Sequence, residues 1–118
     1  MAQYVAFIYD QDVDWSQPTG DQMSEMAEYS AFGEAAASVI RGGAVLYPTA
    51  SSTTVRVSGG KGGDVLSTDG PFADTKEVLT GFYILECADL DEAIETASRI
   101  PAAWGGGAVE VRPVIPMM

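Results

Sequence analysis

The sequence predicts an α+β domain in which one antiparallel sheet carries two helices on a single face. Two stretches, residues 3–9 and 81–87, have apolar residues on both faces of an expected strand, which is typical of central strands covered on both faces. Two further stretches, 19–41 and 89–100, have helical periodicity. The order strand, helix, hairpin strands, strand, helix, strand contains two strand–helix–strand halves, which is the split pattern of a ferredoxin-like fold.

The length of 118 residues suits one hydrophobic core, so we expect a single domain over residues 1–118. The N-terminal apolar run has no basic residue before it and Asp10 directly after it, which indicates a strand and not a signal peptide. No apolar run approaches the roughly 20 residues of a membrane-spanning helix. The single cysteine, Cys87, cannot form an intrachain disulfide and is interpreted as a small buried hydrophobe. We therefore expect a soluble, cytoplasmic protein.

The composition is strongly acidic, with 17 Asp and Glu against 6 Lys and Arg and a formal charge of −11. This charge repels phosphate backbones and anionic lipid, and the scattered cations form no basic stripe. We therefore expect neither a nucleic acid nor a membrane partner, although a basic protein partner would suit the surface. Histidine is absent, which excludes Ser-His-Asp and Cys-His catalysis and leaves carboxylates, lysine, tyrosine or bound water.

The segment from Asp10 to Gly20 is predicted to be an acidic loop. Its Asp10, Asp12 and Asp14 spacing is similar to the start of a calcium-binding EF-hand loop. However, Trp15 occupies the sixth position, where that loop requires glycine, and no entry helix precedes it. A solvated loop is favoured, and we expect no metal.

A long helix follows, with Thr19 or Asp21 as its cap, and it is expected to run to about residue 40 and to end at Gly42-Gly43. Glu25 and its acidic neighbours are expected to face outward. The apolar stripe consists of Met26, Tyr29, Phe32 or Gly33, Ala36, Val39 and Ile40. Among these, a tyrosine can present its hydroxyl to a pocket.

Residues 53–58 and 64–68 are predicted to pair as a hairpin around the glycine-rich turn 59–63. One lysine in such a turn suggests a phosphate-binding loop. That alternative is disfavoured because Gly62 stands after Lys61, where Ser or Thr is needed, and because a strand follows instead of a helix. We therefore expect no cofactor.

The second helix begins at Asp89, whose side chain can cap it together with Glu92, and it ends at Pro101. Short strands are expected at 44–47 and, at an edge, 108–114. The residues expected to be buried by this helix are Leu90, Ala93, Ile94, Ala97 and Ile100. Because two helices cover only one face of the sheet, the second apolar face needs another cover, which a second copy would supply. We therefore expect a homodimer with sheets packed face to face.

The turn Asp69-Gly70-Pro71-Phe72 leads into the most densely functionalised loop of the chain. A structural interpretation makes it a crossover held by Asp69, with Phe72 as an apolar plug. A functional interpretation makes Asp69 or Glu77 a general base and lets Lys76 hold an anionic group of a substrate. The candidate catalytic residues are Asp69, Lys76 and Glu77, and the candidate ligand-binding residues are Tyr9, Tyr29, Phe72 and Tyr83.

Five motifs, from Asp69-Gly70-Pro71-Phe72 through 74–77, 81–83 and 89–93 to 109–114, resemble those of DGPF-domain proteins in the YCII-related family. The resemblance implies a ferredoxin-like domain, dimerised as in the dimeric α+β barrel proteins, with a pocket between the sheet and the long helix. Some members use a His-Asp pair, which this chain lacks. Other relatives are encoded near extracytoplasmic-function sigma factors, which suggests regulation.

Two hypotheses follow from these observations. The first is a dimeric protein of unassigned chemistry that binds or transforms a small molecule. The alternative is a non-catalytic regulatory partner associated with an extracytoplasmic-function sigma factor, for which the acidic surface would suit a basic protein face. A pocket lined by tyrosines and charged side chains would favour the first, and a filled core would favour the second.

Overall fold

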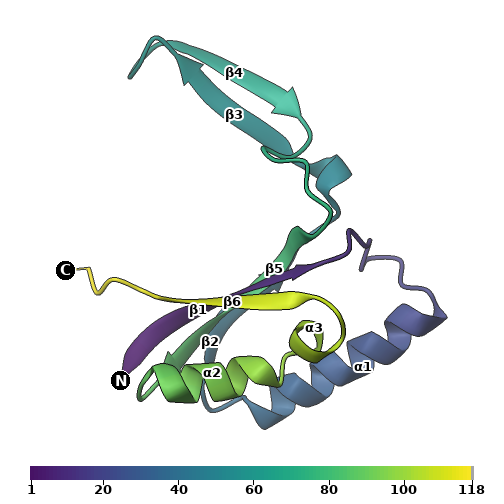
Figure 1. The fold of residues 1–118 in the computed structure, drawn as a ribbon. Coiled ribbons are helices and arrows are strands. Elements are labelled where there is room, and N and C mark those ends of the chain that lie inside the picture. Colours follow the sequence, from purple (N-terminus) through teal and green to yellow (C-terminus); the bar gives the residue numbers. More distant parts are fainter. Residues whose placement is uncertain (118) are drawn as a thin grey trace.

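The computed structural model describes residues 1–117 and consists of a four-stranded antiparallel sheet, a separate two-stranded hairpin and two main helices (Figure 1). The strand order in the sheet is β2-β5-β1-β6. These strands are β1 (Ala2–Asp10), β2 (Ile40–Val45), β5 (Val78–Cys87) and β6 (Ala108–Pro113). The helices are α1 (Gly20–Ala35), α2 (Leu90–Ser98) and the short α3 (Pro101–Trp104). The predicted α+β class is confirmed, as is the central position of the two strands that are apolar on both faces.

The hydrophobic core lies between the sheet and the helices, which cover one face of it (Figure 1). Alternate residues of β1 point to this side, so that Tyr4, Ala6 and Ile8 are buried while the residues between them are not. Leu85 and Cys87 of β5 join them from the neighbouring strand. The helices and their cap residues contribute Phe32, Ala36, Ala93, Ala97, Ile100 and Ala102.

The end of α1 differs from the prediction. The helix begins after Thr19, whose backbone amide donates a 2.8 Å hydrogen bond to the side chain of Gln22, but it ends at Ala35. Gly42-Gly43, expected to terminate the helix, instead lie inside the edge strand β2. The reason is close pairing with β5: a Cβ atom on Gly43 would lie 2.5 Å from the Phe82 carbonyl oxygen. Glycine therefore permits the strand contact here.

Helix α2 begins as predicted, because the Asp89 carboxylate accepts a 2.9 Å hydrogen bond from the Glu92 amide. Its buried side is narrower than predicted. The helix packs on the sheet through small side chains, which leaves Leu90 and Ile94 about half exposed. Pro101 starts α3 at a first-turn position that proline tolerates well.

The hairpin of β3 (Thr53–Ser58) and β4 (Asp64–Asp69) stands away from the rest of the chain, on the side of the sheet opposite the helices (Figure 1). We call residues 53–69 the arm and the remainder the body. The turn at its tip contains three glycines with φ between 82° and 85°, so the predicted hairpin is confirmed. The radius of gyration is 16.4 Å, whereas a compact domain of this length has about 13–14 Å. The projecting arm accounts for the excess.

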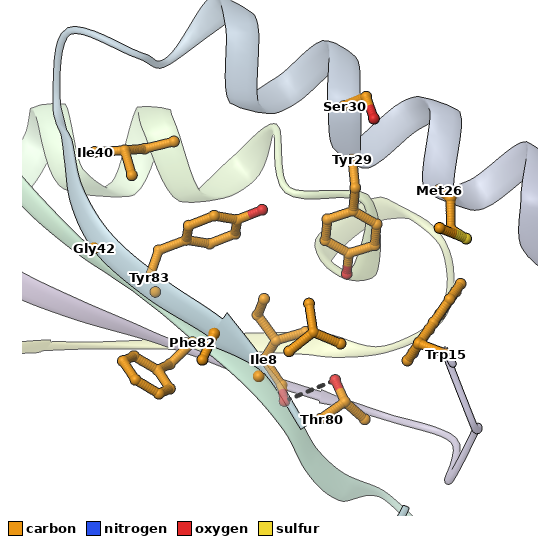
Figure 2. Close-up of a pocket in the computed structure, with 14 residues that line it drawn as sticks. Ile8, Trp15, Met26, Tyr29, Ser30, Ile40, Gly42, Thr80, Phe82 and Tyr83 are labelled. Carbon is orange, nitrogen blue, oxygen red and sulfur yellow. Dashed lines mark hydrogen bonds between the residues drawn. The ribbon is translucent and has the colours of Figure 1, made fainter. Parts of the chain in front are cut away.

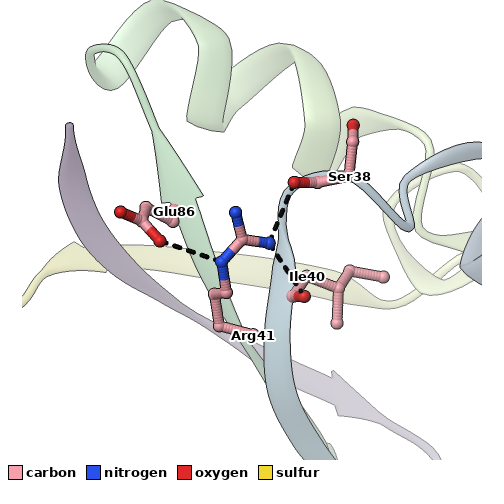
Figure 3. A network of polar contacts seen from close by, with 4 residues as sticks. All are labelled: Ser38, Ile40, Arg41 and Glu86. Atoms are coloured by element: carbon pink, nitrogen blue, oxygen red, sulfur yellow. Dashed lines mark hydrogen bonds and ion pairs between the residues drawn. The ribbon is translucent and has the colours of Figure 1, made fainter.

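Among residues 1–117, no helix covers the second face of the sheet (Figure 1). Its centre is a partly exposed apolar patch in which Val5 opposes Ile84 and Phe7 opposes Phe82. Charged residues flank this patch in ion pairs. Arg41 pairs with Glu86 at 2.8 Å, and Arg112 pairs with Glu110 at 3.8 Å. The Arg41 guanidinium also donates hydrogen bonds to the carbonyl oxygens of Ser38 and Ile40 (Figure 3). We call Val5, Phe7, Phe82 and Ile84 the uncovered patch.

Candidate functional site

A cavity of about 650 Å³ lies between α1 and the sheet (Figure 2). Its size falls in the range of small-molecule sites. Helix α1 forms one wall, strands β1, β2 and β5 form the other, and Trp15 of the preceding loop lies at one side. The lining residues are Ile8, Trp15, Met26, Tyr29, Ser30, Ile40, Gly42, Gly43, Ala44, Val45, Thr80, Gly81, Phe82 and Tyr83.

Tyr29 projects from α1 into the space between helix and sheet (Figure 2). Its ring and that of Trp15 form a T-shaped pair, with 6.3 Å between the ring centroids. Burial, followed by the negative charge of Glu25, raises the pKa of the Tyr29 hydroxyl above its ordinary value of 10.0. The backbone amide of Ala102 acts in the opposite sense but is the smaller influence. The phenol is therefore a protonated hydrogen-bond donor at neutral pH.

Tyr83 projects from β5 with its hydroxyl directed toward Tyr29 (Figure 2). Phe32 packs edge-on against its ring at a centroid separation of 5.2 Å, which fixes the ring orientation. Burial raises the pKa of this hydroxyl as well. Each of the two phenols can donate one hydrogen bond and accept another, so together they form the polar part of the cavity.

The rest of the lining is almost entirely apolar. Within the described residues 1–117, no charged side chain lines the cavity. The Thr80 hydroxyl donates a 3.3 Å hydrogen bond to the Ile8 carbonyl oxygen, so its proton is already committed (Figure 2). Across the same residues, no three carboxylates or thiols lie close enough together to hold a metal ion. The cavity is thus suited to an uncharged molecule that carries a polar group.

Glu25 lies one helical turn before Tyr29, and its position was predicted incorrectly. It was expected to face outward, but it is partly buried, and burial followed by the charge of Asp10 raises the pKa of its carboxyl. The sequence held a signal for this contact, because residues four apart on a helix share a face. The acidic end of β1 adds the second charge, and only the tertiary fold brings it near.

The structure brings together two of the predicted site residues, Tyr29 and Tyr83, in the cavity lining. Tyr9, at the end of β1, is outside that lining. The candidate catalytic residues Asp69, Lys76 and Glu77 are exposed, on the segment that ends β4 and leads to β5, and they do not line the cavity either. Their catalytic roles stay predictions.

Phe72 was expected to be an apolar plug, and this is wrong. Its side chain is 75% exposed, and the Arg56 guanidinium lies over its ring, 5.0 Å from the centroid. The turn is held instead through its backbone. The Gly70 amide donates a 2.8 Å hydrogen bond to the Ser52 carbonyl oxygen, and the Thr54 hydroxyl donates a 2.9 Å bond to the Gly70 carbonyl oxygen. These bonds anchor the turn to the base of the arm.

Cys87 is fully buried and unpaired, as its interpretation as a small hydrophobe requires. Burial, followed by the charge of Glu92, raises the pKa of its thiol. Because the thiolate is the reactive form, this environment keeps the side chain unreactive. In residues 1–117 the structure contains no helix with the length and apolar character needed to cross a membrane.

Comparison with known proteins gives two findings. The chain is 46% identical over 70 residues to an uncharacterised protein of Rhizobium meliloti (strain 1021), a match that covers 58% of this chain and 54% of the relative. The chain thus matches about half the length of that relative. The sequence profile of the YCII-related domain matches residues 2–118, which is nearly the whole chain. The protein therefore belongs to the YCII-related domain family.

Proposed function

We propose that the protein binds a neutral, largely apolar small molecule in the cavity between α1 and the sheet. The observation that carries the proposal is a pair of protonated phenols, Tyr29 and Tyr83, directed into a largely apolar space of about 650 Å³. Apolar walls with a few convergent polar groups are the usual composition of a ligand pocket. The walls would supply affinity, and the phenols would orient the ligand.

The lining defines the class of ligand. An anionic ligand would meet no cation in the cavity wall, and the nearby carboxylate of Glu25 would repel it. A cationic ligand would lose its hydration without gaining an ion pair inside the cavity. An uncharged ring compound with a carbonyl or hydroxyl group loses least on entry. It can accept hydrogen bonds from one or both phenols.

We further propose that the domain is ferredoxin-like and acts as a homodimer joined through the uncovered patch. The sheet order β2-β5-β1-β6, with helices following β1 and β5, supports the first part. An apolar patch flanked by ion-paired charges supports the second, because interfaces typically have an apolar centre and a polar rim. Binding is favoured over catalysis, because Asp69, Lys76 and Glu77 are outside the cavity lining.

The test is a thermal-shift screen with uncharged aromatic and alicyclic carbonyl compounds and alcohols, followed by calorimetry on the best of them. Tyr29→Phe and Tyr83→Phe should each raise the dissociation constant by about 3–10-fold, since each removes one hydrogen bond. Tyr9→Phe is the matched control and should leave the constant unchanged. Equal binding by the double variant Tyr29→Phe/Tyr83→Phe, or a panel in which only charged compounds bind, would overturn the proposal.

A further inference from the structure

The two faces of the arm differ in composition, and one of them gathers three valines. The strand register pairs Val57 with Val65 and places Val55 on the same side. These three residues, which we call the valine face, are 61%, 48% and 70% exposed for Val55, Val57 and Val65. The opposite face carries Arg56, which lies across from Leu66 and whose guanidinium stacks on the Phe72 ring.

The valine face lacks a cover in the isolated chain. The arm stands clear of the body, and every residue of β4 is exposed (Figure 1). A two-stranded hairpin on its own is only marginally stable in water, since it has no second layer against which to bury side chains. A hairpin with a contiguous apolar face therefore gains stability from a surface brought by another molecule.

Charge distinguishes the arm from the body. The arm, residues 53–69, contains two cations, Arg56 and Lys61, and two carboxylates, Asp64 and Asp69, so it has no net charge. The formal charge of −11 consequently belongs entirely to the rest of the chain. From residue 53 to residue 63 the only charges are positive. Strand β3 and the tip of the arm are thus attracted to the acidic surface of an identical copy and not repelled by it.

The position of the arm fixes where such a copy would sit. The arm rises on the same side of the sheet as the uncovered patch (Figure 1). A second copy seated on that patch would be flanked by the arm, and two-fold symmetry would make the contact reciprocal. We infer that the arm is a clasp: in the dimer, the valine face of each copy lies against the body of the other, with Lys61 among its carboxylates. This inference rests on the proposed dimer.

The first test measures association. The triple variant Val55→Thr/Val57→Thr/Val65→Thr keeps β-branched side chains in both strands and makes only the valine face polar. Sedimentation should show its dimer dissociation constant raised on the order of 100-fold, because each change acts twice in a symmetric dimer. Leu66→Thr, on the opposite face of the same arm, is the control and should leave the constant within about twofold.

The outcomes separate the clasp from the dimer on which it rests. A wild-type protein that is monomeric at micromolar concentration overturns both. A triple variant that dimerises as tightly as wild type, while Phe7→Ser in the uncovered patch still abolishes the dimer, overturns the clasp alone. A valine face that matters only for binding a different protein would give the same result and also overturns it.

The second test locates the arm directly. Unlabelled and heavy-nitrogen-labelled chains are refolded together and treated with a carbodiimide, which joins a lysine amine to a carboxylate with loss of water. The clasp predicts mixed-label peptides that join Lys61 to a carboxylate of the body. The control is Lys61→Arg, whose guanidinium does not form this amide. Cross-links of Lys61 found only within single-label chains would overturn the inference.

Discussion

Strands β1 and β3 each have an apolar face, but only the face of β1 is buried. In β1, the inward residues Tyr4, Ala6 and Ile8 are at most 7% exposed, because helices lie over them. In β3, Val55 and Val57 are about half exposed or more, because no element within residues 1–117 packs over them. Alternation therefore determines which residues share a face, and the rest of the chain determines whether that face is buried.

The difference extends to how the two regions hold together. Pairing in the body joins β1 to β5 and β6, which lie far away in the sequence, and it brings the two helices into one core. Pairing in the arm joins only neighbours across a five-residue glycine-rich turn, 59–63. The body should thus unfold as one cooperative unit, while the arm should open locally at a smaller cost in free energy.

The largest expected effect comes from truncating one leucine in each region. Leu85→Ala removes a fully buried side chain from the core and should lower the free energy of unfolding by about 2–5 kcal/mol. Leu66→Ala removes a half-exposed side chain from the side of the arm opposite the valine face and should lower it by no more than about 0.5 kcal/mol. Urea titrations of the two variants measure this. Similar losses would show that the arm belongs to the cooperative core.

A smaller effect is expected in hydrogen exchange. At protein concentrations low enough to favour monomers, the amides of β3 and β4 should exchange on the order of 100-fold faster than those between β1 and β5, since they are released by local opening. Repeating the measurement at a higher protein concentration, where the dimer would form, tests the clasp as well. If the arm is a clasp, its amides should become slower while those of β1 hardly change. Arm amides as slow as core amides in the monomer would contradict the division into two regions.

The same contrast explains how far the sequence predicted the fold. Local signals identified the hairpin, the Asp89 cap and both central strands, because each depends on residues close together in the chain. The errors occurred where contacts between segments distant in sequence determine the local structure or the burial of a residue. Gly42-Gly43 looked like a helix terminator but serve the close approach of β2 to β5. Leu90 and Ile94 were predicted to be buried, but α2 packs on the sheet through its small residues instead.

The candidate site divides in a similar way. The two tyrosines could be named in advance, because an aromatic ring with a polar tip in an otherwise apolar helix or strand is informative by itself. The cavity could not be derived from spacing, since it arises where α1 spans three strands. Trp15 was assigned to a solvated loop, and only the fold places it against Tyr29. Glu25 was missed because the charge of Asp10 reaches it through space.

The smallest expected effect is a change in Tm when one negative charge, that of Glu25, is removed from the acidic body. The folded-state pKa of Glu25 is raised above its ordinary value of 4.5, so the ionised carboxylate is disfavoured in the folded protein. The stability associated with its neutral form is present below about pH 4.5 and is lost as the pH rises through the higher folded-state pKa. Glu25→Gln should therefore raise the Tm at pH 7 by about 1–3 °C, a modest value because the side chain is partly solvated.

Below about pH 4 the difference should disappear, since Glu25 is then mostly neutral in both states. Asp64→Asn, which removes the same charge from the exposed arm, is the control. Both variants remove one negative charge from the protein. Asp64→Asn should nevertheless change the Tm at pH 7 less than Glu25→Gln does, because only Glu25 is partly buried and close to a second carboxylate. Equal shifts for the two variants would mean that total charge alone, and not the position of Glu25 beside Asp10, limits the stability of the body.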